Sequence, residues 1–319
     1  MRAATRTMRC SVPLDVGLTY GPLLRGRRDA SSRIVDNTWL HAMHSPDGPV
    51  SLRVHADRAG AQVRIEAWGP GRAWAIDHAP DIAGVRDGGD DFAPMDALVA
   101  RLHRRLRGLR VVRLGTVYDL AVATTVEQRV TTLEARRSWR ALVRGHGETA
   151  PGTDGLVLPP APASLAALPD WEWRRIGVEQ RRSSTVRRIA REANGLERAI
   201  AASDEVAERR LLGLHGVGPW TAALVMHFAA GDPDAVPIGD WHLPGHIGQA
   251  LAGEPNADDA RMLELLEPFR PHRARVWRLI VCGTSGPPRR APRARIHDLL
   301  RAEASRGRRV EVRPLSRRR

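Results

Sequence analysis

The segment 214–222, Leu-His-Gly-Val-Gly-Pro-Trp-Thr-Ala, constrains the fold most because it predicts two helices joined by a tight glycine turn. The first helix is expected over 205–212, after a Ser-Asp pair suited to capping and before a glycine. The second is expected over 220–230, after a proline suited to the first helical position. Gly216 and Gly218 leave backbone N–H groups uncovered at the start of this second helix, where the helix dipole favours a nucleic-acid phosphate. An ordinary αα-hairpin, in which the glycines only turn the chain, is the alternative.

The charge balance is the second constraint, because 50 basic residues against 36 acidic residues leave a net charge of +14. No lysine occurs in the sequence, so all fifty basic residues are arginines. A field of this sign steers association with DNA or RNA. A genome-wide preference for arginine is the alternative explanation. Runs such as Arg104-Arg105 and Arg187-Arg188 are expected to be solvated helix faces.

Length and cysteine content bound the architecture and the location. At 319 residues the chain can form two domains, each with its own core. Cys10 and Cys282 are too few for a disulfide framework or for a four-thiolate iron–sulfur cluster. Residues 1–24 lack a continuous apolar stretch, and no run approaches the roughly 18 apolar residues of a membrane span. We expect a cytoplasmic, nucleoid-associated protein that binds no membrane.

The N-terminal third has the pattern of a small antiparallel sheet. Three short alternating or apolar stretches predict strands: 38–43, 50–55 and 61–68. The turn sequences Ser-Pro-Asp-Gly and Gly-Pro-Gly punctuate them. Helical spacing over 96–109 then predicts one helix. We therefore expect an N-terminal sheet-plus-helix domain over 1–112.

From residue 113 onward the sequence predicts a helical core. Apolar residues recur at helical intervals over three stretches: 117–143, 183–202 and 260–281. The apolar pattern of the first stretch has one polar interruption, at Thr124-Thr125. The Gly-, Pro- and Ala-rich segment 145–169 is expected to loop across the surface. The fold class is thus an α+β N-terminal domain followed by an all-α core over 113–285, mainly α, with a basic tail over 286–319.

An irregular loop at 235–242, Ala-Val-Pro-Ile-Gly-Asp-Trp-His, presents an aspartate before another predicted helix. Pro237 and Gly239 restrict this backbone, as expected for a loop that presents a functional side chain. Asp240 is a candidate catalytic carboxylate, and a helix N-cap is its alternative role.

Taken together, the hairpin and Asp240 resemble the helix-hairpin-helix DNA glycosylase superfamily, whose motif ends in a catalytic aspartate. The hairpin is most similar to the bacterial inducible 3-methyladenine DNA glycosylase group, DNA-3-methyladenine glycosylase II, and the resemblance covers most of 115–285. Members of that group often place one residue between the proline and the aspartate, whereas this chain has Ile238-Gly239. Asp232 and Asp234 are therefore fallback candidates.

The resemblance implies a role for several positions outside the catalytic aspartate. Gln128 would lie beside the flipped nucleotide, and Arg129 would wedge into the duplex. Backbone phosphate would be held by three hairpin residues: Gly216, Gly218 and Thr221. A monovalent cation, Na⁺ or K⁺, would be held by three hairpin carbonyls: Leu212, Leu214 and Val217. No other cofactor is implied, and the cysteine count excludes the iron–sulfur cluster of related enzymes.

Tryptophans near the motif suit a cationic base, because indole faces attract cations. With Gln128, the candidate pocket residues are Trp220, Trp241 and Trp173, and burial in the core is the alternative for each tryptophan. His242 and His246 are four residues apart, but no third ligand accompanies them, so a zinc site is not expected.

The resemblance implies a monofunctional, monomeric glycosylase of base excision repair that hydrolyses alkylated, 3-methyladenine-like bases out of duplex DNA. Bifunctional relatives cut the strand through a lysine imine, at the position that Trp220 occupies here. Since the chain has no lysine, that route is closed. Two alternatives remain: a DNA-binding protein without catalysis, and a glycosylase for oxidised or mismatched bases.

Overall fold

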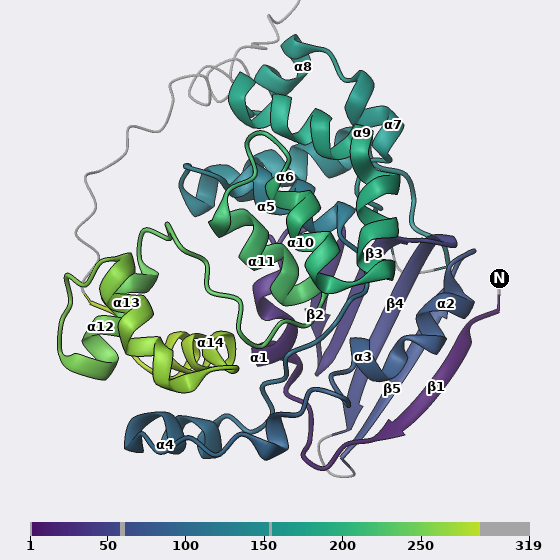
Figure 1. The fold of residues 1–319 in the computed structure, drawn as a ribbon. Coiled ribbons are helices and arrows are strands. Elements are labelled where there is room, and N and C mark those ends of the chain that lie inside the picture. The colour runs from purple at the N-terminus through teal and green to yellow at the C-terminus, as the bar shows by residue number, and fades with distance from the viewer. Residues whose placement is uncertain (1, 58–60, 153–154, 288–319) are drawn as a thin grey trace, which may run out of the picture. The chain divides into compact units, whose positions relative to one another are not determined.

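A five-stranded antiparallel sheet is formed early in the chain in the computed structural model, which describes residues 2–57, 61–152 and 155–287. The strands lie in the order β1-β5-β4-β3-β2 (Figure 1). Their bounds are β1 Ala4–Arg9, β2 Ser32–Val35, β3 Thr38–Ser45, β4 Gly48–Asp57 and β5 Gln62–Trp68. The three predicted strands are confirmed as β3, β4 and β5. The edge strands β1 and β2 were not predicted, because they lack a clear apolar alternation.

One face of the sheet forms the main hydrophobic core. On β4, Val50, Leu52 and Val54 are buried, and on β5 Val63 and Ile65 are buried on the same face. Each such side chain contributes about 1.5–3 kcal/mol on removal from water. Two short helices, α2 (Arg72–Asp77) and α3 (Ala79–Ile82), add side chains to this core. The same cluster continues into the helices that follow, so sheet and helices share one core.

The rest of the described chain is mainly helical. Helix α1 (Val16–Tyr20) lies between β1 and β2 in the chain, and α4 (Ala97–Arg105) lies between α3 and the later helices. The later helices are α5 Tyr118–Glu127, α6 Thr132–His146, α7 Pro162–Ala167, α8 Asp170–Arg175, α9 Gln180–Ala202, α10 Asp204–Leu212, α11 Pro219–Ala229, α12 Leu243–Ala252, α13 Asp259–Leu266 and α14 Arg273–Gly283. Three 3-10 turns lie at Gly21–Leu23, Gly89–Asp91 and Glu267–Phe269. No helix within the described ranges has the length and apolar character that a bilayer span requires.

Two of the predicted helical stretches, 117–143 and 260–281, are each divided into two helices. The polar pair Thr124 and Thr125 leaves the first stretch helical, and both residues are buried inside α5. The break comes a few residues later, where Arg129 has a φ of +54° and Thr131 begins α6 with a capping box. The predicted helix over 260–281 is also divided, into α13 and α14, by the turn that holds the cis Arg270–Pro271 bond.

The segment 145–169 is not the surface loop that its composition predicted. It contains α7 and an isolated bridge between Thr149 and Val157. Ala150, Leu156 and Leu158 form a small buried cluster with Leu40 and Ala42 of β3. These two side chains lie on the face of β3 opposite the main core, so they require apolar cover that this segment supplies.

A second hydrophobic cluster joins α4 to the last three helices. The helix predicted over 96–109 is confirmed as α4. It was assigned to the N-terminal domain, but its Val99 and Leu102 pack with Leu279 and Ile280 of α14. Figure 1 shows α12, α13 and α14 side by side. Residues Met1–Pro287 form one compact unit. The domain limits at 112 and 285 stay predictions, and the predicted basic tail, from residue 288 on, lies outside the described residues.

Candidate active site

The predicted hairpin is confirmed as α10 and α11. The Ser203 hydroxyl accepts a hydrogen bond from the Val206 backbone N–H at 3.2 Å, as expected of an N-cap. Pro219 is the first residue of α11, and Gly218 precedes it in an extended conformation. Because Gly218 has no side chain to cap them, the first backbone N–H groups of α11 are available to bind an anion at this helix end.

The two hairpin glycines have different surroundings. Gly216 has a φ of +97°, and a Cβ placed there would lie 2.0 Å from the Thr185 hydroxyl of α9. A Cβ at Gly218 would meet no atom within 4 Å. Gly216 is therefore required for the turn and for its close approach to α9, whereas Gly218 leaves its side of the backbone open to a ligand.

Gln128 joins the α5–α6 turn to the hairpin. Its side-chain amide donates to the Gly216 carbonyl at 3.0 Å and to the Thr221 hydroxyl at 2.8 Å. Thr221 is 2% exposed, so its hydroxyl lies inside the protein and only its backbone N–H is at the helix start. Three residues that the sequence singled out are thus in direct contact.

Arg129 is presented by a turn that is held from several sides. The Val126 carbonyl accepts from the buried Arg182 guanidinium at 2.7 Å, and Glu127 pairs with Arg25 at 2.7 Å. Arg129 itself is exposed, and within the described residues it has no ion pair or hydrogen-bonded partner. An arginine in this position can reach a ligand without first breaking an internal contact.

Asp240 lies against the start of α11 and at the start of α12. Its Oδ2 accepts from the Trp220 indole N–H at 3.0 Å. Its Oδ1 accepts from the backbone N–H groups of His242 and Leu243, at 2.8 and 2.9 Å. The N-cap residue of α12 is His242, so Asp240 is not the N-cap that its alternative role predicted, although its Oδ1 accepts from N–H groups at this helix start. The three donors fix the orientation of the half-buried carboxylate beside the hairpin.

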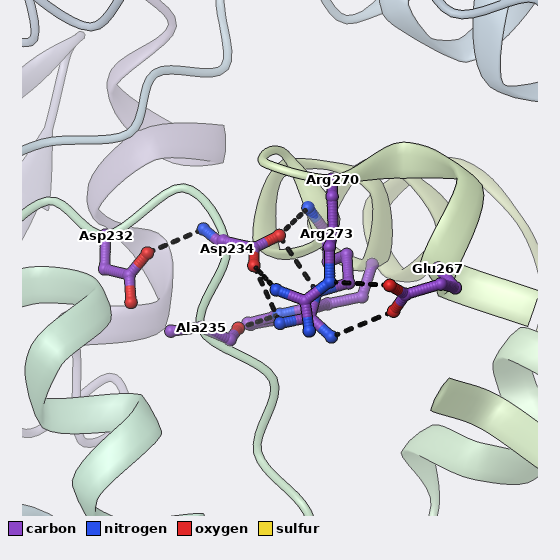
Figure 2. Close-up of polar contacts among 7 residues, drawn as sticks. Asp232, Asp234, Ala235, Glu267, Arg270 and Arg273 are labelled. Carbon is purple, nitrogen blue, oxygen red and sulfur yellow. Dashed lines mark hydrogen bonds and ion pairs between the residues drawn. The ribbon is translucent and has the colours of Figure 1, made fainter. Parts of the chain in front are cut away.

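Figure 2 shows how the chain before Asp240 is anchored to the end of the molecule that carries α14. Asp234, only 19% exposed, accepts from the side chain of Arg273 at 2.7 and 2.9 Å and from Arg270 at 2.9 Å. The Asp234 backbone N–H donates to Asp232 at 2.7 Å, and burial raises the pKa of the Asp232 carboxyl. These bonds occupy both carboxylate oxygens of Asp234. The two fallback candidates for the catalytic carboxylate, Asp232 and Asp234, therefore anchor the loop that leads to Asp240.

The candidate tryptophans do not form one group. Trp220 contacts Asp240, whereas Trp173 is 1% exposed and donates to the Leu168 carbonyl in the core. Trp241 is 79% exposed, so it does not line a preformed wall. The core alternative therefore applies to Trp173, and Trp220 and Trp241 remain pocket candidates.

Some arginines of the predicted basic runs have contacts that the sequence did not reveal. Arg188 donates to the His215 carbonyl at 3.2 Å, which braces the hairpin against α9. Arg187 pairs with Asp170 at 2.5 Å and Arg105 donates to the Gly283 carbonyl, so these runs are not simply solvated faces. Their partners lie far away in the sequence, and no local signal identifies them.

The monovalent cation at the hairpin carbonyls stays a prediction. The Leu214 carbonyl accepts the Val217 N–H at 2.9 Å and retains a second lone pair. Among the residues that the structure describes, no three His, Cys, Asp or Glu side chains gather as metal ligands. His246 instead contacts the Thr284 hydroxyl at 2.9 Å.

Comparison with known proteins finds partial sequence relatives, and no family model matches the chain. The chain is 24% identical over 161 residues to the "Putative DNA-3-methyladenine glycosylase YfjP" of Bacillus subtilis, which covers 49% of this chain and 55% of that protein. It is 28% identical over 138 residues to the "Probable bifunctional transcriptional activator/DNA repair enzyme AlkA" of Mycobacterium tuberculosis, which covers 43% of this chain and 28% of that protein. The chain thus spans about half or less of the length of these curated relatives.

Solved structures match over more of the chain. The 3-methyladenine DNA glycosylase of Archaeoglobus fulgidus has a TM-score of 0.72 at 16% identity, over 86% of this chain and 97% of that one. The Clostridium acetobutylicum 8-oxoguanine glycosylase/lyase has a TM-score of 0.64 at 12% identity, over 87% and 95%. The resemblance predicted from the hairpin and Asp240 is confirmed at the level of the fold: the chain has the helix-hairpin-helix DNA glycosylase fold, and part of its sequence is similar to proteins named as DNA-3-methyladenine glycosylases.

Proposed function

We propose that this chain is a DNA glycosylase of base excision repair that hydrolyses the N-glycosidic bond of alkylated bases in duplex DNA. The observation that carries the proposal is the Asp240 carboxylate, held by Trp220 and the start of α12 beside the phosphate-binding hairpin. The names of its relatives, a DNA-3-methyladenine glycosylase and a DNA repair enzyme, support this choice of substrate class.

The chemistry follows from the charge that develops as the bond breaks. The target base leaves the stack at a cost of about a few kcal/mol, which is smaller for damaged pairs. Positive charge then grows on the sugar, and the Asp240 carboxylate stabilises it and orients the attacking water. The Trp220 N–H holds Oδ2 in place, so that little reorganisation is needed in the transition state. A base alkylated on a ring nitrogen is already cationic and leaves without a general acid.

We further propose that the enzyme removes the base and leaves the strand uncut. Strand cleavage through an imine needs an amine nucleophile, and the sequence contains no lysine. At the position where bifunctional relatives carry this lysine, Trp220 instead donates to Asp240. A monomer is sufficient for this chemistry, because the hairpin and Asp240 come from one chain.

The proposed DNA contacts follow the exposed groups around the hairpin. The backbone N–H groups at Gly218 and Thr221 would bind phosphate at the start of α11, with Gly216 shaping the turn. Arg129 would enter the duplex from its braced turn. The carbonyls of the hairpin would hold a monovalent cation that offsets phosphate charge, and Gln128 and Trp241 would lie near the flipped base.

A specificity for oxidised bases is the second candidate, because solved neighbours include the Clostridium 8-oxoguanine glycosylase/lyase. A panel of duplexes with 3-methyladenine, 7-methylguanine, hypoxanthine and 8-oxoguanine distinguishes these substrates by the base that is released. Release of 8-oxoguanine alone would replace the alkylated base in the proposal.

The decisive variant for the proposed function is Asp240→Asn. It keeps an acceptor oxygen for α12 but removes the charge, so base release should be lost while the duplex Kd stays within about twofold. Asp47→Asn, an exposed aspartate in the β3–β4 turn, is the matched control and should behave as wild type. Full activity of Asp240→Asn would overturn the assignment, and duplex binding without release by wild type would favour a DNA-binding protein that lacks catalysis.

A further inference from the structure

We propose that Asp259 is a positioning residue for Asp240, and that it compensates for the additional residue between Pro237 and Asp240. The inference rests on the proposed function, because it assigns how the catalytic carboxylate is held. The Gly239 backbone N–H donates to Asp259 Oδ2 at 3.0 Å, and the Asp240 N–H donates to the Pro237 carbonyl at 3.2 Å. The residue just before the carboxylate is thus tied to α13.

Gly239 takes up the extra length of the loop. Its φ of +92° lies in the region that only glycine adopts readily, and a Cβ there would meet no atom within 4 Å. Space is therefore not the constraint at this position. The backbone conformation is the constraint, and Asp259 binds the N–H group that this conformation presents.

Asp259 is not needed to cap its own helix. Asp258 is the N-cap of α13 and accepts from the Arg261 backbone N–H at 2.9 Å. Asp259 Oδ1 is buried and has no hydrogen-bond partner within the described part of the chain. A buried acceptor without a partner lowers the stability of the fold. The side chain of Asp259 is therefore not placed to stabilise the fold, and its contact with the Gly239 N–H accounts for its position.

The contact with Asp259 completes a set of ties that fix the loop along its length. Upstream, the Ala235 carbonyl accepts from the Trp277 indole at 3.0 Å, and Asp234 binds Arg273 (Figure 2). Downstream, Asp240 itself is bound to Trp220. Asp259 binds the backbone at Gly239, between these two anchors. At this point the chain has one residue more than is usual in the glycosylase group that it resembles.

The test compares Asp259→Ala with Asp259→Asn in the full chain. Asp259→Ala should slow single-turnover base release about ten- to hundredfold, because small displacements of a catalytic group are costly, with duplex Kd and unfolding temperature unchanged. Asp259→Asn keeps an acceptor for the Gly239 N–H and should retain a rate near wild type. Gly239→Ala should also slow release, because alanine disfavours this φ. A wild-type rate for Asp259→Ala, or equal losses for both Asp259 variants, would overturn the proposal.

Hydrogen exchange at the Gly239 amide tests the positioning without activity. Exchange should be slow in wild type and Asp259→Asn and faster in Asp259→Ala. If wild type releases no base, the proposed function fails while this exchange result still supports the tie. Fast exchange in wild type would overturn the positioning role and leave the proposed function standing.

Discussion

Replacing Gly216 by alanine should destabilise the protein strongly, because two separate costs apply at this position. The left-handed backbone costs a residue with a Cβ about 1–2 kcal/mol. The new methyl would also lie 2.0 Å from the Thr185 hydroxyl and 3.0 Å from its Cβ, and overpacking of this kind costs about 1–3 kcal/mol. We therefore expect the free energy of unfolding of Gly216→Ala to fall by about 2–5 kcal/mol.

Denaturant unfolding followed by circular dichroism measures this change in the free energy of unfolding. A double-mutant cycle separates its steric part from its backbone part. Adding Thr185→Ala removes the hydroxyl that the new methyl meets, so the double variant should recover the steric part. About 1–2 kcal/mol of backbone cost should remain. Full recovery would show that the φ of Gly216 carries no cost.

Gly218→Ala is the matched control, because a Cβ there has open space and the φ of −107° suits any residue. Its unfolding free energy should change by less than about 0.5 kcal/mol. Its duplex Kd should rise, because the methyl lies beside N–H groups that are proposed to bind phosphate. Equal destabilisation by the two alanine variants would refute the distinction drawn between these glycines.

Two further predictions concern the anchoring contacts of Asp234 and the buried carboxyl of Glu197. Asp234→Ala leaves Arg273 with only its longer ion pair to Glu267, at 3.6 Å, and should lower the free energy of unfolding by about 2–3 kcal/mol, whereas Asp47→Asn should not. An unchanged denaturation midpoint would refute the anchoring role of Asp234. Glu197 caps the start of α5 through the Val117 and Tyr118 N–H groups, and burial raises the pKa of its carboxyl to about 7. Because the folded-state pKa lies above the unfolded value, this group's stabilisation is complete below about pH 4.5 and is lost as the pH rises through about 7. Glu197→Gln should therefore flatten the fall in unfolding temperature over this range, and an identical pH profile for both proteins would contradict the assignment.

The sequence predicts the parts of the site that depend on local chemistry. The hairpin follows from its caps, proline and glycines, and Asp240 follows from its place in the motif, so both are found where expected. The Gly216–Thr185 contact joins residues far apart in the sequence and has no local signal. The same holds for Asp259, whose partner Gly239 is twenty residues away. Such contacts depend on how α9 and α13 pack, which periodicity does not specify.

The wrong predictions have a common physical cause. Thr124 and Thr125 interrupt the apolar pattern of the sequence because they are polar, yet tertiary packing buries both within α5. The segment 145–169 was expected to be a loop because of its composition, yet it covers apolar side chains of β3. Trp173 was placed near the pocket because it is close to the motif in the sequence, and the core buries it. In each case burial by distant elements outweighed the local pattern.

The most direct measurement of the central claim is product analysis on a methylated duplex after incubation with the purified full chain. Mass spectrometry identifies any free base, and a denaturing gel shows whether the strand is intact before alkali treatment. We predict free 3-methyladenine, an abasic site that alkali cleaves, and an uncut strand before that treatment. Absence of any released base, or strand cleavage without alkali, would contradict it.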